Sequence, residues 1–250
     1  GSTGGADGRI LIWDLGRGSI VRSLDAHSNY VTGVEFSRDG KTLMSVSTDR
    51  TTKIWDLPSG TVRHNLTGDH MVTSLAMETG RRNLAVGDSE GMIRFWDVGQ
   101  GTRVRELDCG DPSIGSIQFS LDGKTLVVLS RHFDKLTLWE VLSGRKLTSL
   151  EGDSSPFYSQ AFSPDGSTLW AITGEGTIKS WRTSDWKSNW QVKTSSRYVN
   201  NLAVSPDGQK LCTVSYDGFL KLWSADKGKQ IGELKMAPNR CFVDQAAFSS

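Results

Sequence analysis

The sequence predicts an all-β protein that consists of a repeated unit of about 42 residues, and three observations support this prediction. Six tryptophans recur with separations of 42, 41, 43, 42 and 42 residues, and each follows a stretch of alternating apolar and polar residues. Alternation with a period of two is typical of a half-buried β-strand. The chain also combines 27 Gly and 9 Trp with 6 Pro, which favours many short strands joined by tight turns. The repeating tryptophans are Trp13, Trp55, Trp96, Trp139, Trp181 and Trp223.

Each repeat contains the same four predicted strands in the same order. The first ends in an apolar residue followed by Ser, as in VTGVEFS at 31–37, and the second is an apolar run such as TLMSVS at 42–47. An Asp-Gly pair stands between them in most repeats, as at Asp39-Gly40, and predicts a hairpin because that turn needs a positive φ. The third strand carries the repeating Trp, and the fourth is shorter and more polar, as in TVRHNL at 61–66.

The composition argues against several classes of protein. The 29 basic residues are balanced by 28 acidic ones, whereas a dedicated nucleic-acid or anionic-membrane binder carries a clear basic excess. No run approaches the 18 apolar residues that a membrane span needs. The three cysteines are odd in number and lack metal-ligand spacing, so we expect an intracellular, reducing location, the cytoplasm.

The repeats resemble the WD-repeat family, because a Trp-Asp pair ends the third strand at Trp13-Asp14, Trp55-Asp56 and Trp96-Asp97. This resemblance covers the whole chain. It implies a β-propeller of four-stranded antiparallel blades around a central channel. We count six blades in this chain, and a parent protein with seven blades stays open.

The two ends of the chain align with the interior of a repeat. Gly1 falls in the middle of a second strand, and the segment 242–248 reads as a first strand. We therefore expect 242–248 to close the blade that begins at 1–24, which would leave no open sheet edge there. On this prediction residues 1–250 form a single propeller domain that is an excerpt of a longer chain.

The resemblance also implies a buried hydrogen-bonded set in each blade. Its members are a His before the first strand, a Ser or Thr at the end of the second, an Asp in the following turn and the repeating Trp. The second repeat alone looks complete, and the third and fifth repeats carry Glu90 and Glu175 at the Asp position. The expected structural set in the second repeat is His27, Ser47, Asp49 and Trp55.

Residues that could carry chemistry are scattered rather than grouped. The four histidines stand in different sequence contexts, and we find no nucleophile motif, metal-ligand motif or phosphate-binding glycine loop. We therefore expect no catalytic residues, no metal and no cofactor. The alternative is an enzyme or small-ligand binder in the central channel, which would require acids or histidines that converge at one channel mouth.

The remaining candidates lie in the loops before the first and third strands, which share the top face of a propeller. Aromatic residues and Arg gathered on a concave rim have the composition of a protein-binding hot spot. We expect a non-catalytic scaffold for a protein or peptide partner, as a module of a larger polypeptide or complex. In the alternative reading these aromatics plug the channel and pack on neighbouring blades. The candidates are Tyr30, Thr48, Arg50, Met71, Arg131, His132, Phe157, Tyr158, Tyr198, Tyr216, Arg240 and Phe242.

Overall fold

The computed structural model describes residues 1–78, 82–132, 135–194, 199–235 and 248. These residues form 23 β-strands and no helix, which confirms the predicted all-β class. Among them there is accordingly no helix that is long and apolar enough to cross a membrane. The chain consists of two compact units, the N-terminal unit Gly1–Phe119 and the C-terminal unit Ser120–Ser250.

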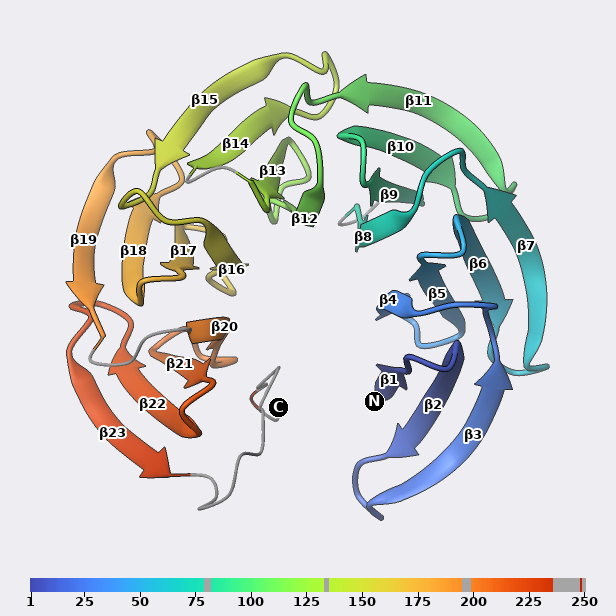
Figure 1. Ribbon diagram of the computed structural model, residues 1–250, viewed down its shortest axis with the longest axis horizontal. Helices are drawn as coiled ribbons and strands as arrows, with labels where there is room; N and C mark the ends of the chain where they lie inside the picture. The colour runs from blue at the N-terminus through green and yellow to red at the C-terminus, as the bar shows by residue number, and fades with distance from the viewer. Residues whose placement is uncertain (79–81, 133–134, 195–198, 236–247, 249–250) are drawn as a thin grey trace. The chain divides into compact units, whose positions relative to one another are not determined.

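The strands pair into six antiparallel sheets, which are the six predicted blades. The first sheet has three described strands in the order β1-β2-β3, and the second and third have four each, β4 to β7 and β8 to β11 (Figure 1). Their bounds are β1 Ser2–Gly4, β2 Arg9–Asp14, β3 Ser19–Asp25, β4 Val31–Phe36, β5 Thr42–Ser47, β6 Thr51–Asp56, β7 Thr61–Thr67, β8 Val72–Met77, β9 Asn83–Asp88, β10 Met92–Asp97 and β11 Thr102–Asp108.

The fourth, fifth and sixth sheets repeat the four-stranded order, from β12 to β15, from β16 to β19 and from β20 to β23. Their bounds are β12 Ile114–Phe119, β13 Thr125–Ser130, β14 Lys135–Glu140, β15 Lys146–Glu151, β16 Phe157–Phe162, β17 Thr168–Thr173, β18 Thr177–Arg182, β19 Ser188–Lys193, β20 Val199–Val204, β21 Lys210–Ser215, β22 Phe219–Ser224 and β23 Gln230–Lys235.

The second strand of each four-stranded sheet is its most buried part. All six residues of β5 are buried, and β9, β13, β17 and β21 each have five buried residues of six. Both faces of such a strand are covered, so its sequence is an apolar run rather than an alternation. The outer strands β7, β11, β19 and β23 are mostly exposed, which explains their polar composition.

Consecutive sheets of each unit pack face to face through large apolar side chains. In the N-terminal unit, Ile10 and Leu24 of the first sheet share a cluster with Leu43 and Trp55 of the second. In the C-terminal unit, Trp170 of β17 packs with apolar residues of β20 to β22. Burial of these side chains, each contributing roughly 1.5–3 kcal/mol, is the main stabilising contribution between neighbouring sheets.

The Asp-Gly turns form as predicted. Gly40 adopts a φ of 66°, in the left-handed region that glycine tolerates best. Asp39 Oδ1 accepts hydrogen bonds from Ser37 Oγ (2.6 Å) and from the backbone N–H of Lys41 (3.0 Å). These bonds hold the pKa of Asp39 below its ordinary value and connect the ends of β4 and β5.

The predicted closure of the first blade falls mainly outside the described residues. Of the segment 242–248 only Phe248 is described, and it is half-buried. The first sheet therefore shows three strands of the four that we expect, and its closure stays a prediction.

Candidate protein-interaction surface

A buried hydrogen-bond network ties the second sheet to the loop that precedes it. Trp55 Nε1 donates to Ser45 Oγ (2.9 Å), and the same hydroxyl lies 2.8 Å from His27 Nε2. His27 Nδ1 lies 3.2 Å from Asp49 Oδ2 and 2.9 Å from Thr51 Oγ1. The imidazole is fully buried and both of its nitrogens have partners, so it holds the loop before β4 in one position.

The electrostatics of this network follow from burial and hydrogen bonding. Burial lowers the pKa of His27 below its usual 6.5, even though Asp49 acts in the opposite direction. Burial alone would raise the pKa of Asp49, but hydrogen bonds from Thr51 and from the Ser28 backbone lower it to about 2. At neutral pH the network therefore holds a neutral imidazole beside an ionised carboxylate.

The predicted membership of this network was wrong at one position. The hydroxyl that joins Trp55 to His27 belongs to Ser45, whereas we expected Ser47. Leu43 pairs with Trp55 across β5 and β6, so Ser45 is the diagonal neighbour of the indole and Ser47 lies two residues further on. Ser47 Oγ instead accepts from the Asp49 backbone N–H (3.0 Å) and donates to the Asn29 carbonyl (3.3 Å).

The third sheet replaces this network with a buried ion pair. Asp88 is almost fully buried and its Oδ2 accepts a hydrogen bond from Arg94 Nη1 at 2.6 Å. Arg94 also reaches Glu106 (3.2 Å), while Glu90, which stands at the Asp49 position, is exposed. The longer Glu is therefore turned outward, and a carboxylate two residues earlier takes its place.

In the fifth sheet a third set of polar groups anchors the loop before the first strand. Asp153 occupies the His27 position before β16, and its Oδ2 accepts hydrogen bonds from Thr173 (3.1 Å) and Thr177. Its Oδ1 accepts from Ser155 Oγ at 2.7 Å. Glu175, at the Asp49 position, is again exposed. The loops before the first strands are thus anchored by different polar groups in different sheets.

These anchored loops form what we call the top edge of each unit: the loops before the first strand and between the second and third strands of its sheets. In the N-terminal unit the Tyr30 carbonyl accepts a hydrogen bond from the Thr48 N–H (3.1 Å). In the next sheet the Met71 carbonyl accepts a hydrogen bond from the Ser89 N–H (3.0 Å). These bonds fix the backbone of both loops and leave the side chains of Tyr30 and Met71 58% and 48% exposed.

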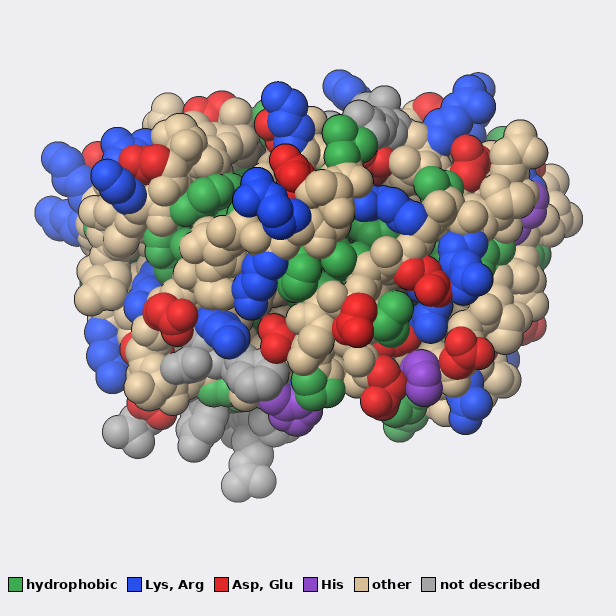
Figure 2. Space-filling model, turned by 90° about the horizontal axis from the view of Figure 1, so that it is seen from above, with side chains coloured by type: hydrophobic (Ala, Val, Ile, Leu, Met, Phe, Trp, Pro, Cys, Tyr) green, Lys and Arg blue, Asp and Glu red, His purple; other side chains and the backbone are tan. Residues whose placement is uncertain are grey.

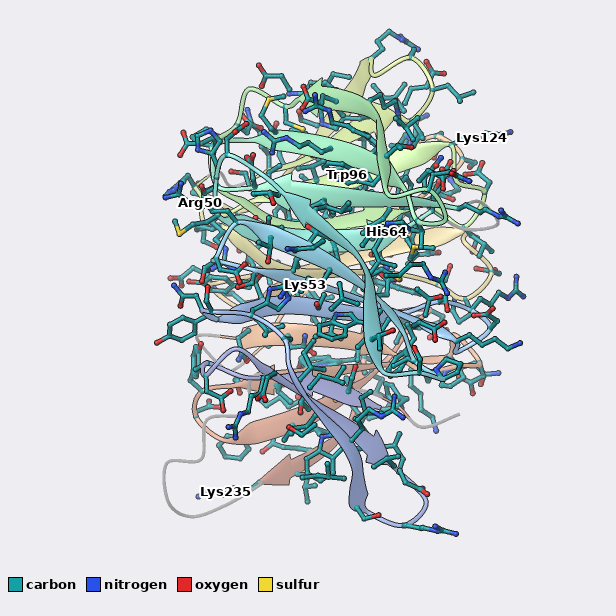
Figure 3. All side chains as sticks on the ribbon, turned by 90° about the vertical axis from the view of Figure 1, so that its right-hand side faces the viewer. Arg50, Lys53, His64, Trp96, Lys124 and Lys235 are labelled. Atoms are coloured by element: carbon teal, nitrogen blue, oxygen red, sulfur yellow. The ribbon has the colours of Figure 1, made fainter. Side chains whose placement is uncertain are left out.

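Arg50 and Thr48 complete the described candidates of this unit. Arg50 has a φ of 70° and is exposed; Figure 3 shows it at the edge of the strands, while Lys53 lies along them. Thr48 is half-buried. The N-terminal top edge therefore presents an aromatic ring, a thioether and a guanidinium to solvent.

In the C-terminal unit the top edge presents Tyr216, in the loop between β21 and β22, and Tyr158 lies beside that edge at the start of β16; their side chains are 46% and 51% exposed. Arg131 and His132 are also exposed. The Tyr158 ring packs over Gly174, where a Cβ atom would come within 2.8 Å of it. This glycine lets the ring lie against the backbone of the neighbouring loop, so Tyr158 is held in place on one side.

Phe157 corrects the predicted site. It is fully buried and packs edge-on against Trp181, with ring centroids 6.0 Å apart. A bulge between Phe157 and Ser159 turns Phe157 into the core and sends Tyr158 outward. Phe157 is therefore a core residue. Tyr198, Arg240 and Phe242 lie outside the described residues.

The surface is chemically mixed. Basic and acidic side chains are interspersed over the face shown in Figure 2. In the described parts of the chain, no group of three or more His, Cys, Asp or Glu residues is arranged to hold a metal ion. The arrangement suits contact with another macromolecule through separate exposed anchors.

Six antiparallel sheets, each carrying a tryptophan in the strand next to its outer strand, define a β-propeller repeat protein. The sequence model of the family described as "WD domain, G-beta repeat" matches residues 18–56, 144–182 and 187–224. Together with the six sheets and the relatives described next, these matches show that the chain belongs to the WD-repeat β-propeller family.

Three relatives illustrate the similarity. Autophagy-related protein 16 of Arabidopsis thaliana is 28% identical over 171 residues, which are 67% of this chain and 33% of that protein. Cell division cycle 20.5, cofactor of APC complex, of the same plant is 31% identical over 196 residues, 72% of this chain and 43% of that protein. Small ribosomal subunit protein RACK1y of Oryza sativa subsp. japonica is 30% identical over 170 residues, 64% and 50% respectively. The match spans half or less of each of these proteins.

Proposed function

We propose that this chain is a non-catalytic protein–protein interaction scaffold that presents its top edge to a protein or peptide partner. The observation that supports the proposal best is the exposure of Tyr30 and Met71 on loops of two consecutive sheets, each fixed by a backbone hydrogen bond to another loop of its own sheet. In the C-terminal unit Tyr158, at the start of β16, and Tyr216, in the loop between β21 and β22, are also exposed. Large side chains on a fixed backbone lose little conformational entropy on binding, and aromatic residues are enriched among interface hot spots.

The roles of the anchors differ. The aromatic rings would fill pockets on the partner, where loss of a hot-spot side chain costs about 2 kcal/mol or more. Arg50 and Arg131 would pair with acidic groups at the margin, and such charges mainly change the association rate. Tyr198, Arg240 and Phe242 belong to this proposal through their position in the sequence alone.

The relatives support the same kind of role. Cell division cycle 20.5 is named a cofactor of the APC complex, and a relative from Schizosaccharomyces pombe, 27% identical, is named target of rapamycin complex subunit wat1. By analogy we propose that this chain is a module of a larger polypeptide or complex in the cytoplasm. Burial raises the pKa of the Cys212 thiol to about 11, so this side chain stays a protonated, weakly reactive thiol at neutral pH.

The test is a binding titration with top-edge variants against a partner purified by affinity capture. We expect Tyr30→Ala and Met71→Ala each to raise the Kd by roughly tenfold or more, since 1.4 kcal/mol is a factor of ten. Lys41→Ala and Lys124→Ala, in Asp-Gly turns at the opposite ends of their sheets, are matched controls. Loss of binding in the lysine variants with retention in the top-edge variants would contradict the proposal.

A further inference from the structure

A groove lies at the end of the C-terminal unit opposite its top edge, between the fifth sheet (β16–β19) and the sixth (β20–β23). Its volume is about 710 Å³. We call it the basal groove. Its lining residues include Pro164, Asp165, Trp170, Asp207, Asp226 and Ile231. This volume is within the usual range of binding pockets, roughly 300–1,000 Å³.

The basal groove has an acidic lining: Asp165 and Asp207 belong to Asp-Gly turns of the repeat, and Asp226 adds a third carboxylate. Three aspartates line it against a single cation, Lys210. Hydrogen bonds from Ser163 and Ser167 lower the pKa of Asp165 to about 2, so its carboxyl is ionised at neutral pH. The corresponding groove between the second and third sheets is balanced, because it is lined by three arginines and three carboxylates: Arg38, Arg63, Arg82, Glu35, Asp39 and Glu78.

Trp170 makes this groove chemically distinct. In the repeat register it stands where β5 has Met44, β13 has Val127 and β21 has Cys212, all smaller or more flexible side chains. It is 3% exposed, and among the described residues its indole Nε1 has no hydrogen-bond partner. Ser180, which pairs with Trp170 across β17 and β18, has a buried Oγ that also lacks a hydrogen-bond partner among the described residues. A buried donor without a partner is destabilising, and a hydrogen-bond acceptor supplied by a ligand would offset that cost.

The walls of the basal groove are held in place before any ligand arrives. Trp190 Nε1 donates to the Ala225 carbonyl (3.2 Å), and the Ala225 N–H donates to the Gln209 carbonyl (2.9 Å). On the other side Pro164 abuts Gly208, where a Cβ atom would lie 3.1 Å from the ring. A groove with fixed walls loses less entropy when it binds a ligand.

We propose that the basal groove binds an extended peptide segment that carries an arginine or lysine side chain. The cation pairs with Asp226, which is exposed and forms no ion pair within the described residues, and with Asp207. The aliphatic stem of the basic residue lies along Ile231 and Pro164, and a peptide carbonyl accepts the Trp170 indole N–H. The site is separate from the top edge, so it does not depend on the proposed function.

The test uses the chain as it is and a blocked pentapeptide, acetyl-Ala-Leu-Arg-Leu-Ala-amide, as the probe. The readout is the indole N–H resonance of Trp170 in a ¹H–¹⁵N spectrum, assigned with Trp170→Phe. We expect a saturable shift of this resonance. The peptide with citrulline in place of Arg should bind about tenfold or more weakly, because a charge-assisted hydrogen bond contributes more than a neutral one.

Variants locate the site. We expect Asp226→Asn and Asp207→Asn each to weaken binding by roughly fivefold or more. Glu175→Gln removes the same charge from an exposed loop at the top edge of the fifth sheet and should leave binding unchanged. Three results would each overturn the proposal: no shift of the Trp170 resonance at millimolar peptide, equal binding of the citrulline peptide, or an equal loss in Glu175→Gln. Circular dichroism of each variant distinguishes loss of the site from loss of the fold.

Discussion

Replacement of Trp55 by Ala removes the side chain that links the first two sheets of the N-terminal unit. The indole is 5% exposed and packs with Ile10, Leu24 and Leu43. A buried Trp→Ala change typically costs about 3–5 kcal/mol. The change also removes the donor to Ser45 Oγ, and such a hydrogen bond contributes about 1 kcal/mol. We therefore expect the free energy of unfolding to fall by roughly 4–6 kcal/mol.

The assay is urea denaturation followed by far-UV circular dichroism, with Trp186→Ala as the matched control. Trp186 lies outside the repeat register and is only half-buried, at the margin of the core cluster around Trp181. Its loss should cost less than about half as much as the loss of Trp55. Equal shifts of the midpoint in the two variants would refute the assignment of Trp55 to the repeating core.

A double-mutant cycle tests which serine belongs to the network. Trp55→Phe keeps most of the apolar volume but removes the indole donor. Combined with Ser45→Ala it should show a coupling energy of about 0.5–1.5 kcal/mol. Combined with Ser47→Ala it should be additive, because Ser47 bonds to the turn and not to the indole. Coupling to Ser47 in place of Ser45 would contradict the observed register.

Three further outcomes are expected. Arg94→Leu should destabilise the fold by about 3–5 kcal/mol because it leaves a buried carboxylate unpaired, whereas Arg103→Ala, which loses a half-exposed pair, should cost less than about 1 kcal/mol in the same denaturation assay. Because the pKa of His27 is lower in the folded chain than its ordinary 6.5, the unfolded chain binds this proton more readily; stability from His27 is present above pH 6.5 and is lost as the pH falls below it. His27→Asn should flatten that part of the stability profile, and an unchanged slope would count against a neutral buried imidazole. If 242–248 closes the first blade, Ala6→Cys with Phe248→Cys should form an intrachain disulfide under mild oxidation, detected by mass spectrometry, and failure to cross-link would contradict the closure.

The fold could be predicted from the sequence because its signals are local and repeated. The alternation before Trp55 and its five counterparts and the Asp-Gly turns each specify a strand or a hairpin without reference to the rest of the chain. The strand predicted at 42–47 forms as β5 (Thr42–Ser47), and the structure shows that all six of its residues are buried. Sequence alone could not reveal the substitutes for the family network, since Arg94 acts from another position in the repeat and Asp153 is a different residue type at the position of His27.

The candidate site was less predictable because it depends on side-chain direction. Ser45 and Ser47 are two residues apart in one strand and point to the same face, so only the cross-strand register decides which one meets Trp55. Phe157 and Tyr158 are adjacent, and a one-residue bulge decides which of them is exposed. Neither the register nor the bulge has a signature in the residue types.

We propose that the top edge is the surface that contacts a protein partner. Amide hydrogen exchange of the chain, measured with and without a captured partner, tests it directly. We expect slower exchange in the loops at 28–30, 48–50 and 69–71, and no change in the opposite turn at 37–41. Protection confined to 37–41 and its counterparts, with the top-edge loops unchanged, would contradict it.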